Sequence, residues 1–281
     1  MKNIAVIELD MMSVKLTIAS VVKNSVVILN QVTEPLNFTT DLLDDEIIKA
    51  PRINEAIEIC QSFKSLCDAY EVVETTCLSH RKFYNFKNEV SFYEQIYGKC
   101  GLKFKEMTVE EEVNGYYFAV INSIDVSRGV LFCVNLNDTV ILNFSKRSIF
   151  EKTVIDFGTL NTLQKLGIEN ANPSEMLDKV YKFFKAELEK IEWLKNLDAD
   201  VSVVGMGKYF LSICKLARKI TKYPLEIENM YSLSKEDFAQ TYKFLSGLDI
   251  DKTKKIKGIS QDRADLFAAS LAIYKAIYDT F

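Results

Sequence analysis

Apolar and polar side chains alternate over the first 34 residues in the way that is typical of β-strands. The alternation covers residues 3–9, 14–22 and 25–32, and polar turn residues separate the three runs. Three consecutive strands are therefore predicted at the start of the fold. Beyond them, the apolar positions of residues 53–70 recur every three or four residues, which indicates an amphipathic helix.

The same order of elements then begins again. A helix is predicted over residues 108–124, where Thr108 and Glu111 have the spacing of a capping box, and we expect it to connect the two halves. The remaining predicted strands are residues 72–79, 128–137, 139–145, 148–156 and 200–205. The remaining predicted helices are residues 91–101, 172–194, 211–220, 234–247 and 261–279.

A strand triplet followed by mixed helices and strands thus occurs twice. This repeat predicts an α/β fold with two lobes, one over residues 1–122 and one over residues 123–281. The chain has 281 residues, which is long enough for two cores of ordinary size. In such folds we expect a ligand to bind in the cleft between the lobes.

Charge and hydropathy exclude several classes of protein. A net charge of −4 and a pI of 5.4 argue against a dedicated nucleic-acid binder, which needs clustered Lys and Arg. No apolar run approaches the roughly 20 residues of a membrane helix, and the first residues do not resemble a signal peptide. We therefore expect a cytoplasmic protein that binds neither nucleic acid nor membrane.

Cysteine and histidine limit the chemistry further. The six cysteines contain no CxxC pair, so buried free thiols are predicted. His80 is the single histidine, which leaves no second one for a two-histidine metal site. Because it lies in a charged stretch, we expect it to be solvated or to lie on the surface of a helix.

Four segments carry a resemblance to a known family. RKFYN (81–85) resembles ReAxN, and EEVNGYYFAV (111–120) resembles EEAxLxxxGV. VVGMGKYFLSICKL (203–216) is similar to GxGGTxxxLAxL. GISQDRADLFAASLAI (258–273) is similar to a family segment that has a glycine, the tripeptide RAD and a closing helix. In this order they resemble the exopolyphosphatase/guanosine pentaphosphatase (Ppx/GppA) family. The resemblance implies two ribonuclease H-like lobes of the actin, acetate and sugar kinase and chaperone superfamily, with an interlobe cleft.

The family's reaction is Mg²⁺-dependent hydrolysis of a terminal phosphoanhydride, in polyphosphate or in guanosine pentaphosphate. By resemblance Glu112 is the catalytic base that orients water; the alternative is an acid that favours the positive end of a helix. The resemblance also implies a homodimer, without indicating its surface.

The phosphate-binding residues are also carried over by resemblance. Arg81 and Asn85 match residues beside the family's phosphate site, and ordinary surface residues are the alternative. Gly205 and Gly207 follow a strand and precede a helix, where backbone N–H groups could hold phosphate, or where glycine simply permits a tight turn. Lys208 replaces a glycine of this motif and could either bind phosphate or close the pocket.

Two phosphate loops depart from the family pattern. In the first, DxGSNS, Glu8 keeps a carboxylate as a metal ligand and Ser13 keeps a hydroxyl for phosphate, but Met11 and Met12 replace polar residues. In the second, DIGGGSTE, the chain reads NLNDTVI. Asn135 stands at the position of the metal-binding aspartate, and Asp138 could supply the missing carboxylate.

These departures leave two principal hypotheses open. The first is a phosphoanhydride hydrolase of the Ppx/GppA type, weakened by its degenerate loops. The second is an inactive relative that binds a phosphorylated ligand or a protein partner in the cleft. A sugar-kinase-like phosphotransferase ranks third, because its phosphate loops would be degenerate as well.

Overall fold

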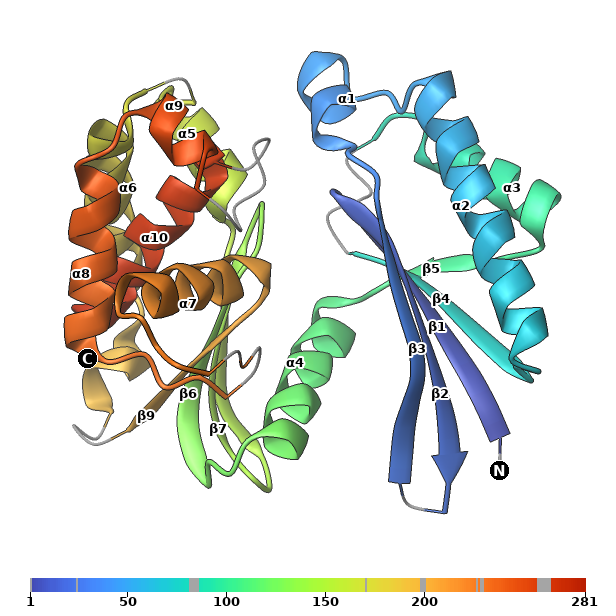
Figure 1. Cartoon of the computed structure of the whole chain (residues 1–281), viewed down its shortest axis with the longest axis horizontal. Coiled ribbons are helices and arrows are strands. Elements are labelled where there is room, and N and C mark those ends of the chain that lie inside the picture. The colour runs from blue at the N-terminus through green and yellow to red at the C-terminus, as the bar shows by residue number, and fades with distance from the viewer. Residues whose placement is uncertain are drawn as a thin grey trace. The chain divides into compact units, whose positions relative to one another are not determined.

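The structure, a computed structural model, forms two compact units (Figure 1). The described residues are 2–23, 25–80, 86–169, 171–197, 201–225, 227, 230–256 and 264–281. The first unit spans Met1–Glu112 and the second spans Val113–Phe281, so the division lies within helix α4 (Val109–Ser123). The division predicted from the sequence, into lobes of residues 1–122 and 123–281, remains a prediction.

The first unit contains a five-stranded sheet with the order β3-β2-β1-β4-β5. The three opening strands pair antiparallel, and β4 and β5 add to them in parallel. The strands are β1 (Lys2–Asp10), β2 (Ser13–Val22), β3 (Ser25–Pro35), β4 (Glu74–Ser79) and β5 (Phe104–Glu106). The predicted strand triplet is therefore confirmed.

Helices of the first unit bury the faces that their sequence periodicity indicates. They are α1 (Thr39–Asp44), α2 (Ala50–Ala69) and α3 (Glu89–Cys100). Helix α2 buries Ile53, Cys60 and Phe63, which share one face at helical spacing. Helix α3 packs against α2, as Figure 1 shows, and ends at Gly101, whose φ of 69° is the left-handed conformation that glycine adopts most readily.

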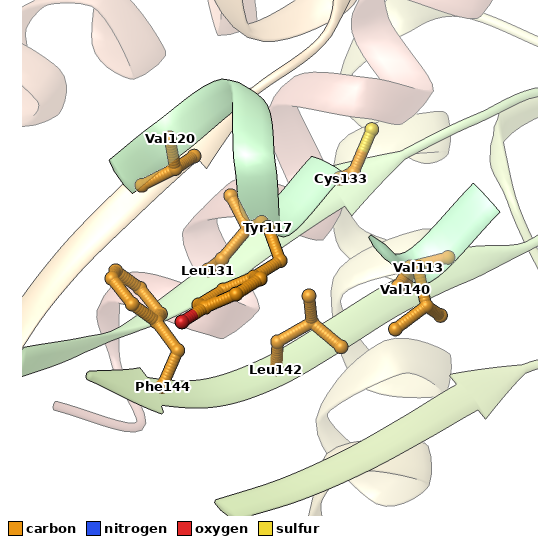
Figure 2. Packing of buried hydrophobic residues seen from close by; sticks show 8 residues of the cluster. All are labelled: Val113, Tyr117, Val120, Leu131, Cys133, Val140, Leu142 and Phe144. Atoms are coloured by element: carbon orange, nitrogen blue, oxygen red, sulfur yellow. The ribbon is translucent and has the colours of Figure 1, made fainter. Parts of the chain in front are cut away.

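The second unit contains a four-stranded sheet with the order β8-β7-β6-β9, in which β6 and β9 are parallel. The strands are β6 (Arg128–Val134), β7 (Thr139–Ser145), β8 (Ile149–Ile155) and β9 (Ser202–Met206). Helix α4 packs on β6 and β7 (Figure 2). The buried hydrophobic residues at this contact form a cluster that comprises Val113, Tyr117, Val120, Leu131, Cys133, Val140, Leu142 and Phe144.

Helix α10 (Ala264–Tyr278) is the most apolar element of the second unit. All its side chains from Leu266 to Tyr274 are buried, as expected for a helix that is apolar on every side. It contacts α5 (Thr159–Leu166), α6 (Pro173–Glu189), α7 (Lys208–Ile220), α8 (Lys235–Ser246) and α9 (Ile250–Lys254). A 3-10 helix, η2 (Glu192–Asn196), follows α6. Across the described ranges, no helix combines the length and the apolar character needed to cross a membrane.

Candidate functional site

The β1–β2 turn, which the resemblance aligns with the first phosphate loop of the family pattern, has two buried methionines. Met11 and Met12 are 3% and 5% exposed. Their carbonyl oxygens accept hydrogen bonds from the backbone N–H groups of Phe38 (2.8 Å) and Leu36 (3.1 Å). The segment after β3 thus packs on this turn, and thioethers occupy positions where the family pattern has polar side chains.

The two candidate residues beside this turn have different surroundings. Ser13 is buried and stands opposite Asp10 in the β1–β2 ladder. Glu8 is half exposed, and its Oε2 lies 3.6 Å from the Nζ of Lys15 on β2. An exposed pair of this kind contributes little to stability. Glu8 therefore presents a carboxylate beside a lysine at the surface of the first unit.

Glu112 is buried and lies next to a histidine. Its side chain is 2% exposed, and Oε1 lies 3.0 Å from the Nε2 of His80. His80 directly follows β4, where its backbone N–H donates to the carbonyl of Leu9 at 2.9 Å. Neither expected environment of His80 was right: it does not lie in a helix, and its side chain is only 26% exposed and has an acidic partner.

The first turn of α4 determines which acid points inward. The predicted capping box is confirmed, because the backbone N–H of Thr108 donates to Glu111 Oε2 (2.9 Å) and that of Glu111 donates to Thr108 Oγ1 (3.2 Å). The hydrogen bond from Lys105, followed by those from Thr108, lowers the pKa of Glu111 to about 2. Glu111 is exposed whereas Glu112 is buried.

The β6–β7 turn, which the resemblance aligns with the second phosphate loop, is closed by hydrogen bonds between its own residues. Asn135 Nδ2 donates to Asp138 Oδ1 at 2.8 Å, and the backbone N–H of Asn135 donates to the Asp138 carbonyl at 2.9 Å. Asn135 Nδ2 also lies 3.3 Å from the hydroxyl of Tyr116, and Cys133 Sγ lies 3.6 Å from Asn135 Oδ1. Asp138 is 1% exposed.

Gly158, at the start of α5, packs against this turn and was missed by the sequence analysis. A Cβ at Gly158 would lie 2.3 Å from the Asn135 carbonyl oxygen and 2.7 Å from the Asp138 nitrogen. The next two backbone N–H groups, of Thr159 and Leu160, donate to the carbonyls of Asn135 and Leu136. A lone glycine before a helix was the only signal available in the sequence.

Three further candidate phosphate residues, Gly205, Gly207 and Lys208, lie where β9 ends and α7 begins. Gly207 has a φ of 96°, and a Cβ there would lie 3.4 Å from Cys133 Sγ, so this glycine lies beside the end of β6. A Cβ at Gly205 would lie 2.5 Å from the ring of Phe210, so Phe210 packs closely against this glycine. Lys208 begins α7 and is exposed.

The described residues do not fit a Mg²⁺ site. They contain no group of three or more acidic, histidine or cysteine side chains arranged for a metal. In the second unit, the amide N–H of Asn135 points at Asp138 Oδ1, where a cation would require oxygen ligands only. Glu8 lies in the first unit beside Lys15. Arg81 and Asn85 lie outside the described residues.

The fold and the sequence together define the protein's relationships. Two α/β units, each with an antiparallel strand triplet extended by a parallel strand, define an actin-like ATPase fold with ribonuclease H-like lobes, as predicted. The chain belongs to the Ppx/GppA phosphatase family, whose sequence profile matches residues 17–281. No curated protein matches the sequence.

Solved structures of the family have the same fold. The Aquifex aeolicus family member is 19% identical, with a TM-score of 0.82, over 100% of this chain and 90% of that chain. An exopolyphosphatase from Cytophaga hutchinsonii is 14% identical, with a TM-score of 0.87, over 99% of this chain and 91% of that chain. At these identities the similarity establishes the fold.

Proposed function

We propose that this protein is a phosphoanhydride hydrolase that releases terminal phosphate from polyphosphate or guanosine pentaphosphate, with weakened activity. Family membership supports the class of substrate. The observation that carries the proposal is the buried Glu112 carboxylate, held 3.0 Å from an imidazole. Glu112 is then the base that orients the attacking water.

Burial distinguishes Glu112 from an acid that only favours the positive end of α4. Glu110 and Glu111 already provide that charge from exposed positions in the same turn. Burying a third carboxylate costs free energy unless it is paired, and His80 is a partner of Glu112 within the described part of the chain. The arrangement therefore supports a role in chemistry for Glu112.

Weak activity follows from the two turns. The buried methionines and the closed Asn135–Asp138 turn replace groups that would stabilise charge on the phosphoryl oxygens. In other enzymes, losing one such donor lowers kcat by about 100- to 1000-fold. Slow turnover is expected, with Mg²⁺ or Mn²⁺ supplied in the assay.

The test is phosphate release from long-chain polyphosphate and from guanosine pentaphosphate, with Mg²⁺ or Mn²⁺ and at high enzyme concentration. Glu112→Gln is expected to abolish the release seen with the wild type, because an amide cannot accept the proton of water. Glu110→Gln is the matched control, since Glu110 is exposed in the same turn. If neither the wild type nor Glu112→Gln releases phosphate, the proposal fails.

The closed β6–β7 turn favours a second candidate: an inactive relative that binds a phosphorylated ligand or a protein partner. Here Asn135 satisfies a buried carboxylate without any cation. Titration calorimetry with polyphosphate, guanosine tetraphosphate, ATP and ADP tests the ligand version of this candidate. The absence of binding heat for all four would eliminate that version.

Asn135→Asp tests whether the amide has replaced a metal. The change puts a second, partly buried carboxylate within hydrogen-bonding distance of the buried Asp138, so at pH 7 the melting temperature should fall by about 4 °C in EDTA. Mg²⁺ should restore it in the variant and leave the wild type unchanged. Differential scanning fluorimetry measures both values, with Asn122→Asp on α4, an exposed position, as control. If Mg²⁺ stabilised both proteins equally, the hypothesis that the Asn135 amide has taken the place of a metal ion would be contradicted.

A further inference from the structure

We propose that His80 is a positioning residue for Glu112: its imidazole holds the carboxylate in the orientation needed to accept a proton from water. This inference rests on the proposed hydrolase function. It adds a role for His80, for which the sequence analysis had predicted none. It is carried by the 3.0 Å distance between His80 Nε2 and Glu112 Oε1 together with the burial of the carboxylate.

Both partners are attached to well-anchored backbone. His80 follows β4, whose last residue, Ser79, is in register with Leu9 of β1, and the His80 N–H extends this pairing to the Leu9 carbonyl. Glu112 lies in the first turn of α4, where its backbone N–H donates to the carbonyl of Thr108 at 3.0 Å. Little rotation of the main chain is therefore available to separate the two side chains.

The chemistry of the contact requires a hydrogen on Nε2. A general base acts as a carboxylate, which only accepts hydrogen bonds, so in this role His80 donates through Nε2–H to Glu112 Oε1. The two oxygens of a carboxylate offer about four acceptor positions. One imidazole bond is therefore compatible with a further bond from the attacking water.

In the proposed reaction step, His80 neither gains nor loses a proton. The water oxygen forms a bond to the terminal phosphorus while Glu112 takes one proton of the water. The phosphoanhydride P–O bond breaks, and its electron pair leaves with the shortened chain. His80 restricts the rotation of the Glu112 carboxylate during this step, and misplacing a reacting group by about 1 Å can cost about 100-fold in rate.

The other buried acids of the described residues are paired differently. They are Asp41 and Asp138. Asp41 Oδ2 accepts the backbone N–H of Lys49, and Asp138 accepts the amide of Asn135 in the same turn. Both are local contacts that shape a loop. Glu112, in contrast, contacts a side chain from another element, which is the arrangement expected where carboxylate orientation matters.

The first experiment compares polyphosphate hydrolysis by wild type, His80→Leu and His80→Gln. His80→Leu should lower kcat by about 10- to 100-fold with KM changed less than twofold, because substrate binding does not depend on the imidazole. His80→Gln, whose amide can donate to Glu112 from a similar reach, should recover kcat to within about fivefold of wild type. If His80→Leu is as active as wild type, or if His80→Gln is as slow as His80→Leu, the positioning role is overturned.

The second experiment does not depend on turnover. His80 is the only histidine, so protein labelled with ¹³C and ¹⁵N in histidine gives one set of imidazole resonances. Nε2 should carry the hydrogen in wild type, and its resonance should shift in Glu112→Gln but not in Glu110→Gln. An unchanged Nε2 resonance in Glu112→Gln would overturn the contact itself. A shifted resonance in a wild-type protein that releases no phosphate would instead remove the hydrolase proposal and leave His80 with a structural contact only.

Discussion

Gly158 illustrates how a single residue without a side chain determines the shape of a candidate site. It allows the first N–H groups of α5 to reach the carbonyls of Asn135 and Leu136. Its φ of −127° is accessible to other residues, so the requirement comes from space and not from backbone strain. The space next to it is occupied by backbone atoms of the β6–β7 turn, which cannot move aside as a flexible side chain could.

We therefore predict that Gly158→Ala destabilises the second unit by about 2 kcal/mol, because overpacking against backbone forces the turn or α5 to shift. Chemical denaturation followed by circular dichroism measures the change. Gly115→Ala in α4 is the control, since a Cβ there meets nothing within 4 Å and alanine favours the helix. A Gly158→Ala variant as stable as wild type would contradict the close approach of α5 to the turn.

At the scale of elements, the edge strand β3 has a long uncharged stretch, and its charged residue and its proline, Glu34 and Pro35, lie only at its end. Residues 25–33 carry no charged side chain, and Val26 and Ile28 are 63% and 54% exposed. Among the other edge strands, β5 and β8 each contain a lysine and a glutamate, whereas β9 is uncharged but has only five residues. Charged residues on an edge discourage pairing with another chain, so the long uncharged stretch of β3 favours aggregation.

Introducing a charge on this strand should reduce aggregation. Ile28→Lys is expected to lower light scattering during heating or refolding, while the free energy of unfolding changes by less than about 0.5 kcal/mol because the side chain is exposed. Val90→Lys in α3 is the charge-matched control, being 71% exposed and away from any strand edge. If both variants reduce scattering equally, net charge and not the β3 edge is responsible.

At the scale of the whole molecule, the thiols form a common feature of both units. All six cysteines are free and buried, as predicted. Burial raises the pKa of Cys60 to about 12 and that of Cys77 to about 11 in the first unit, and that of Cys214 to about 12 in the second. In the unfolded chain these thiols ionise near pH 8.5.

This difference predicts alkaline destabilisation under reducing conditions. Because the folded pKa values are raised, the stabilisation is complete below about pH 8.5 and is lost as pH rises towards 11 to 12. Each thiol should lower the free energy of unfolding by about 1.4 kcal/mol per pH unit in that window. Denaturation at pH 8, 9 and 10 measures the slope, and Cys60→Ala should reduce it. A slope identical in Cys60→Ala would show that other groups cause it.

The family assignment also belongs to this scale, since the sequence profile extends over nearly the whole chain. The cytoplasmic location, expected from the hydropathy of the chain, and the homodimer, implied by the family resemblance, both stay predictions. Short elements escaped the sequence analysis: β5 has three residues and α5 has eight. Such segments are too short to show a clear period. The helix predicted over residues 172–194 is divided, because α6 ends at Glu189 and η2 follows.

The sequence alone determined the order of elements and the repeated α/β pattern, because strand and helix periods are local properties of the chain. It also indicated the family, through motifs whose order is preserved even where single residues differ. Only the tertiary structure decided that His80 meets Glu112, that Asn135 closes on Asp138, and that Gly158 admits the start of α5. These contacts depend on how turns and distant segments pack, and no local period of side chains records them.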